Sequence, residues 1–140
     1  MKGIAGPAAL AVAAAMFVCG CSVVRESPSS AVLTGAQWRV VEIDGAAVTT
    51  EPGPSIDFGD EGRAFGSGSC NRFSVSYTLP GDGRLSLGHA VSTKMACEPG
   101  RMAQEQRFFK ALETVDRYAI GADGELVLYA GDSPRLRARR

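Results

Sequence analysis

The sequence predicts one α+β domain: a curved antiparallel β-sheet or cracked small β-barrel of about eight strands, with one α-helix packed on it. Short segments alternate apolar and polar residues and are separated by turns rich in Gly and Asp, which is typical of antiparallel strands. A later segment, residues 101–115, instead repeats its apolar residues every three or four positions, as an amphipathic helix does. A helix on one side of an antiparallel sheet defines the α+β class.

The N-terminus has the features of an export signal. Lys2 is followed by a small and apolar run to Val18, which is typical of a secretory signal peptide. The run ends in Val-Cys-Gly-Cys, which resembles a bacterial lipobox with a small residue directly before the lipidated cysteine. Cys21 fits this pattern, whereas Cys19 follows the β-branched Val18. We therefore predict a signal peptide at residues 1–20 and a lipid on Cys21, with an uncleaved helical anchor as the alternative.

Residues 21–31 are polar and rich in Ser and Pro, so they predict a flexible tether between the lipid and a domain at residues 32–140. Each buried methylene adds about 0.8 kcal/mol, so the two or three acyl chains of a lipoprotein, such as palmitate, anchor it stably. This predicts a location at the cell membrane or outer membrane, with the domain facing the periplasm or the cell exterior.

The remaining cysteines, Cys70 and Cys97, are an even pair in a chain predicted to be exported. Disulfides persist in oxidising compartments, so we expect these two residues to be joined. Closing the loop between them stabilises the fold by roughly 3.5 kcal/mol in the chain-entropy model.

The strand pattern can be followed along the domain. Residues 36–43 alternate around Trp38 and Val40 and end at Asp44-Gly45, which is a strong hairpin signal. Further short strands are expected at residues 46–49, 56–58, 63–66, 73–77, 85–87, 118–120 and 126–129 and near Leu136. Gly66-Ser-Gly-Ser69 reads as a bulge or bend where two backbones approach closely, because it lacks the lysine of a phosphate loop.

The predicted helix places Phe108, Leu112 and Val115 on one side. Its polar residues, which include Gln104 and Glu105, are expected on the opposite side, towards solvent. The arginine-rich tail, from Arg135 to Arg140, is interpreted as the outer side or frayed end of a last strand, with contact to anionic lipid as the alternative.

Several of these residues resemble the META domain, the HslJ-like family of bacterial envelope proteins. The likeness covers residues 33–136 and is most specific in Cys70-Asn71 and in Thr93 with Met95-Ala-Cys97. It implies a curved antiparallel sheet with one helix, no established catalytic chemistry, and a loose link to heat shock and envelope stress. One departure is Ser69, where the family usually has Gly. If the backbone needs a positive φ there, Ser69 is strained.

Candidate chemistry is sparse. Cys70, Asn71 and the single histidine, His89, are residue types that a thiol hydrolase uses. A hydrolase site is not expected, because export favours a disulfide at Cys70. No Cys or His spacing predicts a metal site, no cofactor is expected, and Asn71 is read as a backbone cap. With 15 basic and 15 acidic residues, the chain is not expected to bind nucleic acid.

The sequence therefore predicts a non-enzymatic envelope lipoprotein that works as a binding or stress-tolerance module, with the membrane and an unknown envelope protein as partners. The alternative is a carrier of a small hydrophobic ligand. The aromatic residues are expected in the core first, and part of the set would line an apolar groove if the barrel is cracked open: Trp38, Phe58, Phe73, Tyr77, Phe108, Phe109 and Tyr118.

Overall fold

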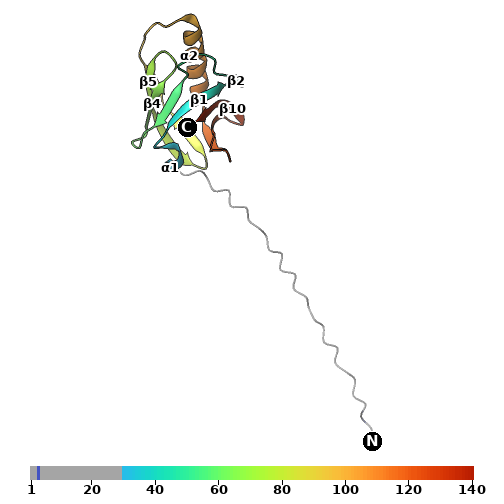
Figure 1. Cartoon of the computed structure of the whole chain (residues 1–140). Coiled ribbons are helices and arrows are strands. Elements are labelled where there is room, and N and C mark those ends of the chain that lie inside the picture. The colour runs from blue at the N-terminus through green and yellow to red at the C-terminus, as the bar shows by residue number, and fades with distance from the viewer. Residues whose placement is uncertain (1–2, 4–29) are drawn as a thin grey trace.

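The computed structural model describes residue 3 and residues 30–140 (Figure 1). The predicted signal peptide, Cys21 and most of the predicted tether lie outside the described residues. The elements are α1 (Ser30–Leu33), β1 (Gln37–Ile43), β2 (Ala46–Ala47), β3 (Ser55–Phe58), β4 (Arg63–Ser67), β5 (Arg72–Gly81), β6 (Arg84–Leu87), β7 (Val91–Ser92), α2 (Pro99–Leu112), β8 (Arg117–Ile120), β9 (Leu126–Ala130) and β10 (Ser133–Arg139). Helix α1 thus includes the last two residues that the sequence assigns to the tether.

Eight strands of the described part form a closed antiparallel barrel. They follow one another around it in the order β1, β3, β4, β5, β6, β8, β9 and β10, and β10 pairs with β1 to close the ring. Strands β2 and β7 are additions that pair with β1 and β5. The predicted α+β fold, with a curved antiparallel sheet and one main helix, is confirmed. The shortest strand pairing in the barrel is between β6 and β8, where Arg84 pairs with Arg117.

Two hairpin turns use an Asp-Gly pair with positive φ at both residues. Asp44 and Gly45 have φ values of 50° and 77° and join β1 to β2, as the sequence predicts. Asp82 and Gly83, at 54° and 71°, join β5 to β6. This conformation matches the twist of the flanking strands, which is why Asp-Gly is favoured there. The second turn is shorter than the sequence suggests, because β5 continues through Pro80.

The barrel interior is filled by the inward side chains of the strands and by one side of α2. Trp38, Phe58 and Phe108 are fully buried in this core. Helix α2 begins at Pro99, where a proline suits the first helical turn, and ends at Leu112. In Figure 1 it descends from the top of the domain, whereas α1 lies at the bottom. Within the described part of the chain, neither helix is long and apolar enough to span a membrane.

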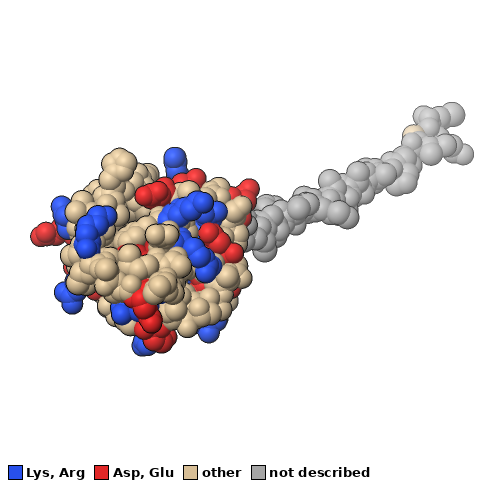
Figure 2. Space-filling view, turned by 90° about the horizontal axis from the view of Figure 1, so that it is seen from above, with Lys and Arg blue, Asp and Glu red and all other residues tan. Residues whose placement is uncertain are grey.

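The arginine-rich tail lies in the closing strand β10 except for Arg140, which follows the strand. Its ion pairs reach carboxylates of neighbouring elements: Arg135 with Asp44, Arg137 with Glu42 and Glu125, and Arg139 with Glu125. The hydrogen bond that Arg137 donates to the Glu125 carboxylate raises the pKa of the Arg137 guanidinium above its ordinary value. The guanidinium of Arg140 lies 4.5 Å from the centre of the Trp38 ring. Figure 2 shows basic and acidic side chains interspersed on the visible face.

We expect Gly66→Ala to destabilise the barrel, because a Cβ at this position would lie 1.9 Å from the backbone oxygen of Ser55 on β3. Relieving that overlap would cost at least about 2 kcal/mol of unfolding free energy, as overpacking does. Urea unfolding measures the loss. The matched control is Gly100→Ala in the first turn of α2, where the nearest atom is 3.6 Å away. This control should be neutral or slightly stabilising, and equal midpoints for the two variants would contradict the close approach.

Candidate functional site

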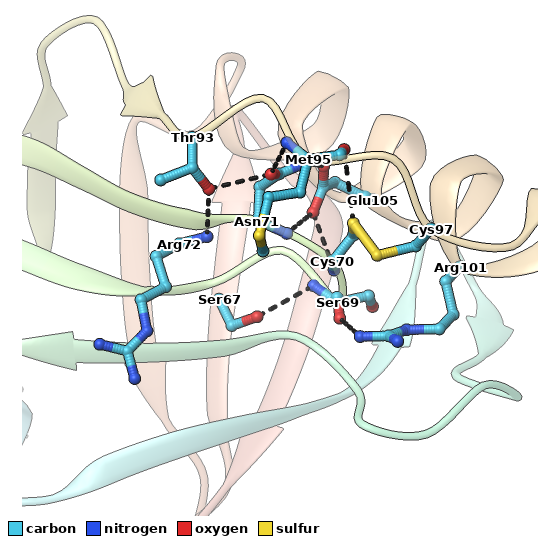
Figure 3. Close-up of a disulfide and its surroundings, with 10 residues drawn as sticks. All are labelled: Ser67, Ser69, Cys70, Asn71, Arg72, Thr93, Met95, Cys97, Arg101 and Glu105. Carbon is cyan, nitrogen blue, oxygen red and sulfur yellow. Dashed lines mark hydrogen bonds between the residues drawn. A yellow bond between two sulfur atoms is a disulfide. The ribbon is translucent and has the colours of Figure 1, made fainter.

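The family-motif residues meet at one end of the barrel around a disulfide (Figure 3). Cys70 and Cys97 are bonded, with their Cα atoms 6.0 Å apart. The bond joins the turn between β4 and β5 to the segment that leads from β7 into α2. Cys70 is buried and Cys97 is half-buried. Two segments distant in sequence are therefore fixed side by side.

The side chain of Asn71 connects the same two segments. Its Oδ1 accepts hydrogen bonds from the Thr93 hydroxyl at 2.9 Å and from the Met95 N–H at 2.6 Å. Its Nδ2 donates to the Met95 carbonyl at 3.3 Å and to Glu105 Oε1 at 2.7 Å. An amide side chain offers two donors and two acceptor positions, so every hydrogen-bonding position of the Asn71 side chain is occupied. It binds backbone, as the sequence suggests, but 24 residues away rather than locally.

Glu105 on α2 is the buried carboxylate of this site. Its Oε2 accepts the backbone N–H groups of Cys70, at 2.9 Å, and of Asn71, at 2.6 Å. With the bond from Asn71 Nδ2, the carboxylate has three N–H donors at 6% exposure. Burying a charge is costly unless hydrogen bonds compensate it, and here they do so on both oxygens. The helix is thereby fastened to the turn that carries the disulfide.

Gln104, the preceding residue, is also buried and fastens the same end of the barrel. Its Oε1 accepts the N–H groups of Thr49 and Thr50 at 3.1 and 3.3 Å. Its Nε2 donates to the Thr50 carbonyl at 3.2 Å and to the Ser69 hydroxyl at 2.8 Å. One turn earlier on α2, Arg101 donates to the Ser69 carbonyl. The start of α2 thus holds both the β2–β3 and the β4–β5 connections.

The expectation that Gln104 and Glu105 face solvent is wrong, because both are at most 6% exposed. Both side chains are polar, but they have enough hydrogen-bond partners to be buried. The spacing of residues along the helix does indicate that these two side chains are buried. Arg101, Gln104, Glu105 and Phe108 stand at i, i+3, i+4 and i+7, so they share the helix side of a core phenylalanine.

Ser69 adopts the backbone conformation that makes it unfavourable. Its φ is 117°, a region that glycine tolerates far better than serine. The strain expected from the sequence is therefore present. Part of it is offset by the hydrogen bond between the Ser69 hydroxyl and Gln104 and by the bond from the Ser69 N–H to the Ser67 hydroxyl at 3.3 Å.

Of the residues weighed for catalysis, Cys70 and Asn71 lie side by side in this site. The sulfur of Cys70 is bonded to Cys97, so it is not a free thiol. His89 is exposed on the connection from β6 to β7. Among the residues that the structure describes, no three His, Cys, Asp or Glu side chains converge on a metal position.

These features define a class of protein: a small closed β-barrel fastened at one end by a Cys-Asn turn, a disulfide and a buried helix carboxylate. The META domain profile matches residues 31–140, and the chain belongs to this family. Two solved structures share the fold, both by NMR. One, from Burkholderia xenovorans, has a TM-score of 0.63 and 24% identity over 98% of this chain and 97% of that chain. The other has a TM-score of 0.62 and 23% identity over 79% of this chain and 94% of that chain. No curated protein matches the sequence.

Glu105→Ala should destabilise the oxidised protein by about 3 kcal/mol or more, because it leaves two backbone N–H groups and the Asn71 amide without an acceptor. Chemical denaturation followed by tryptophan fluorescence measures the change. Gln106→Ala, an exposed neighbour on the same helix, is the control and should stay within about 0.5 kcal/mol of the parent. A loss no larger than that of the control would show that the carboxylate does not fasten the turn.

Two substitutions of Ser69 separate backbone strain from the hydroxyl hydrogen bond. Both Ser69→Ala and Ser69→Gly remove the bond to Gln104, but only glycine relaxes the backbone at a φ of 117°. We expect the glycine variant to be more stable than the alanine variant by about 1–2 kcal/mol. Thermal unfolding at one pH compares them. An alanine variant as stable as the glycine variant would be incompatible with strain at this residue.

Proposed function

We propose that the protein is a lipoprotein of the bacterial cell envelope, anchored through Cys21, with its META domain as a non-enzymatic binding or stress-tolerance module. The observation that carries this proposal is the lipobox-like sequence at residues 18–21, followed by a domain that contains a disulfide. Disulfides persist outside the reducing cytoplasm, so a domain that contains one suits an exported protein. The lipobox and the disulfide therefore support the same compartment.

The geometry of the domain suits a tethered module at the cell membrane or outer membrane, facing the periplasm or the exterior. Chain entry is at α1, at the bottom of the domain in Figure 1, whereas α2 begins at the top. The start of α2, which Gln104 and Arg101 hold to the barrel, thus lies far from the point where the chain enters the domain. A stress-tolerance role agrees with the disulfide and the buried network, which oppose unfolding.

A non-enzymatic role is favoured by how the polar side chains of the site are used. Asn71, Gln104 and Glu105 direct their hydrogen bonds to backbone groups and to one another. Such side chains hold segments in place, and they leave few groups to act on a substrate. Binding would therefore use the outer surface of the barrel, with another envelope protein as the partner.

The carrier of a hydrophobic ligand is the weaker proposal. A carried molecule would occupy the barrel interior, where Trp38, Phe58 and Phe108 are fully buried. Protein interiors are close-packed, so a ligand of useful size would have to displace these side chains. The packed core favours binding at the surface.

Two cysteine substitutions test the anchor. Cys21→Ser should abolish acylation and release the protein from membranes, whereas Cys19→Ser, two residues earlier, should leave both unchanged. Intact mass of protein extracted from native membranes reports the acyl chains. Reduction of the same sample should add one hydrogen to each of the two disulfide sulfurs. An unacylated mass for the parent protein, or membrane retention of Cys21→Ser, would refute the anchor.

A further inference from the structure

A groove of about 760 Å³ lies on the outside of the barrel next to the disulfide. Its floor contains Ser55 on β3 and Ser67 on β4, which are paired in register. The same row continues to Arg39 on β1, opposite Ser55, and to Arg72 on β5, opposite Ser67. Small hydroxyl side chains thus lie between two arginines.

A third guanidinium reaches the groove from α2. Arg101 lines it at the disulfide end, and Figure 3 shows Arg72 and Arg101 on either side of Ser67. Arg101 donates through Nη2 to the Ser69 carbonyl, while its buried Nε has no partner among the described residues. Three arginines from three elements therefore border one hollow.

The charge of these arginines is not neutralised within the described residues. The side chains of Arg39 and Arg72 make no ion pair there, in contrast to the arginines of β10, which are paired with carboxylates. The carboxylate that lines the groove, Glu51, accepts the N–H of Gly53 at 3.3 Å. The groove therefore carries a local excess of positive charge on a chain that is neutral as a whole.

Apolar side chains border this charged groove. Met95 lines it and is 55% exposed. Phe65, which is 45% exposed, lines an adjoining hollow of about 300 Å³ that shares Ser55, Ser67 and Arg72 with the groove. Aromatic residues, Met and Arg are enriched where proteins bind one another, so this combination suits contact with another protein.

We infer that this groove binds an extended acidic segment of a partner protein, with carboxylates on the arginines and an apolar side chain against Phe65 or Met95. Arginine forms paired hydrogen bonds with carboxylates, which gives such contacts their orientation. The backbones of β1 and β5 are three strand spacings apart, roughly 14 Å, which an extended chain of about four residues spans. The inference rests on the proposed function as a binding module and specifies the chemistry of its partner.

Fluorescence anisotropy with a labelled peptide, Glu-Glu-Phe-Glu-Glu, tests the inference on the full chain purified from membranes in non-ionic detergent. The acidic peptide should bind, and its glutamine counterpart should not. Arg39→Ala and Arg72→Ala should each weaken binding by about three- to tenfold, and high salt should weaken it too. Arg63→Ala, an exposed arginine on β4 outside the groove, is the control and should change affinity by less than about twofold.

Equal binding of the glutamine peptide, or equal losses in the Arg63 and Arg72 variants, would overturn the inference. Inorganic phosphate that binds as tightly as the peptide, and depends on Arg72, would instead indicate a small-anion site. Arg72-dependent binding to phosphatidylglycerol vesicles without peptide binding would indicate a lipid surface, which also overturns it. If Cys21 is acylated but the peptide does not bind, the peptide-binding role of the groove is rejected and the lipid anchor stands. If the peptide binds but Cys21 is not acylated, the lipid anchor is rejected and the binding role of the groove stands.

Discussion

The hydrogen bonds of the Glu105 carboxylate decide how one end of this barrel is built. The carboxylate is buried and receives N–H groups from Cys70 and Asn71. It fixes where α2 crosses the barrel and also the conformation of the turn between β4 and β5. Asn71 extends the network to Thr93 and Met95, so that three segments distant in sequence share one set of bonds. A buried network of this kind stabilises the fold only when every member is satisfied, as Asn71 and Glu105 are.

The disulfide and the strained Ser69 both adjoin this network. The turn must present two consecutive N–H groups to Glu105, and Ser69, directly before them, takes the φ of 117°. The covalent bond from Cys70 to Cys97 then limits how far the turn can separate from the segment before α2. Strain in one residue is tolerated because several bonds around it oppose its relaxation. These restraints also position Met95 and Arg101 at the edge of the groove that Arg39, Arg72 and Arg101 border.

The sequence predicted the parts of the fold that depend on local patterns. Alternation around Trp38, the Asp44-Gly45 turn and the helix with Phe108 on its buried side are all present. Burial of Glu105 was missed because its three donors come from residues more than 30 positions away, which no local pattern reveals. Closure of the barrel depends likewise on a pairing between the first and last strands. The groove could not be foreseen, because pairing register alone brings Arg39 and Arg72 into one row.

That closing pair, β1 with β10, places Arg39 opposite Arg139. Contacts between residues about a hundred positions apart give a fold a high contact order, and folds of this kind form slowly. Strand β10 follows the other barrel strands of the described part in sequence, so the ring cannot close until β10 has been synthesised. The barrel therefore stays incomplete until its two most distant strands have met.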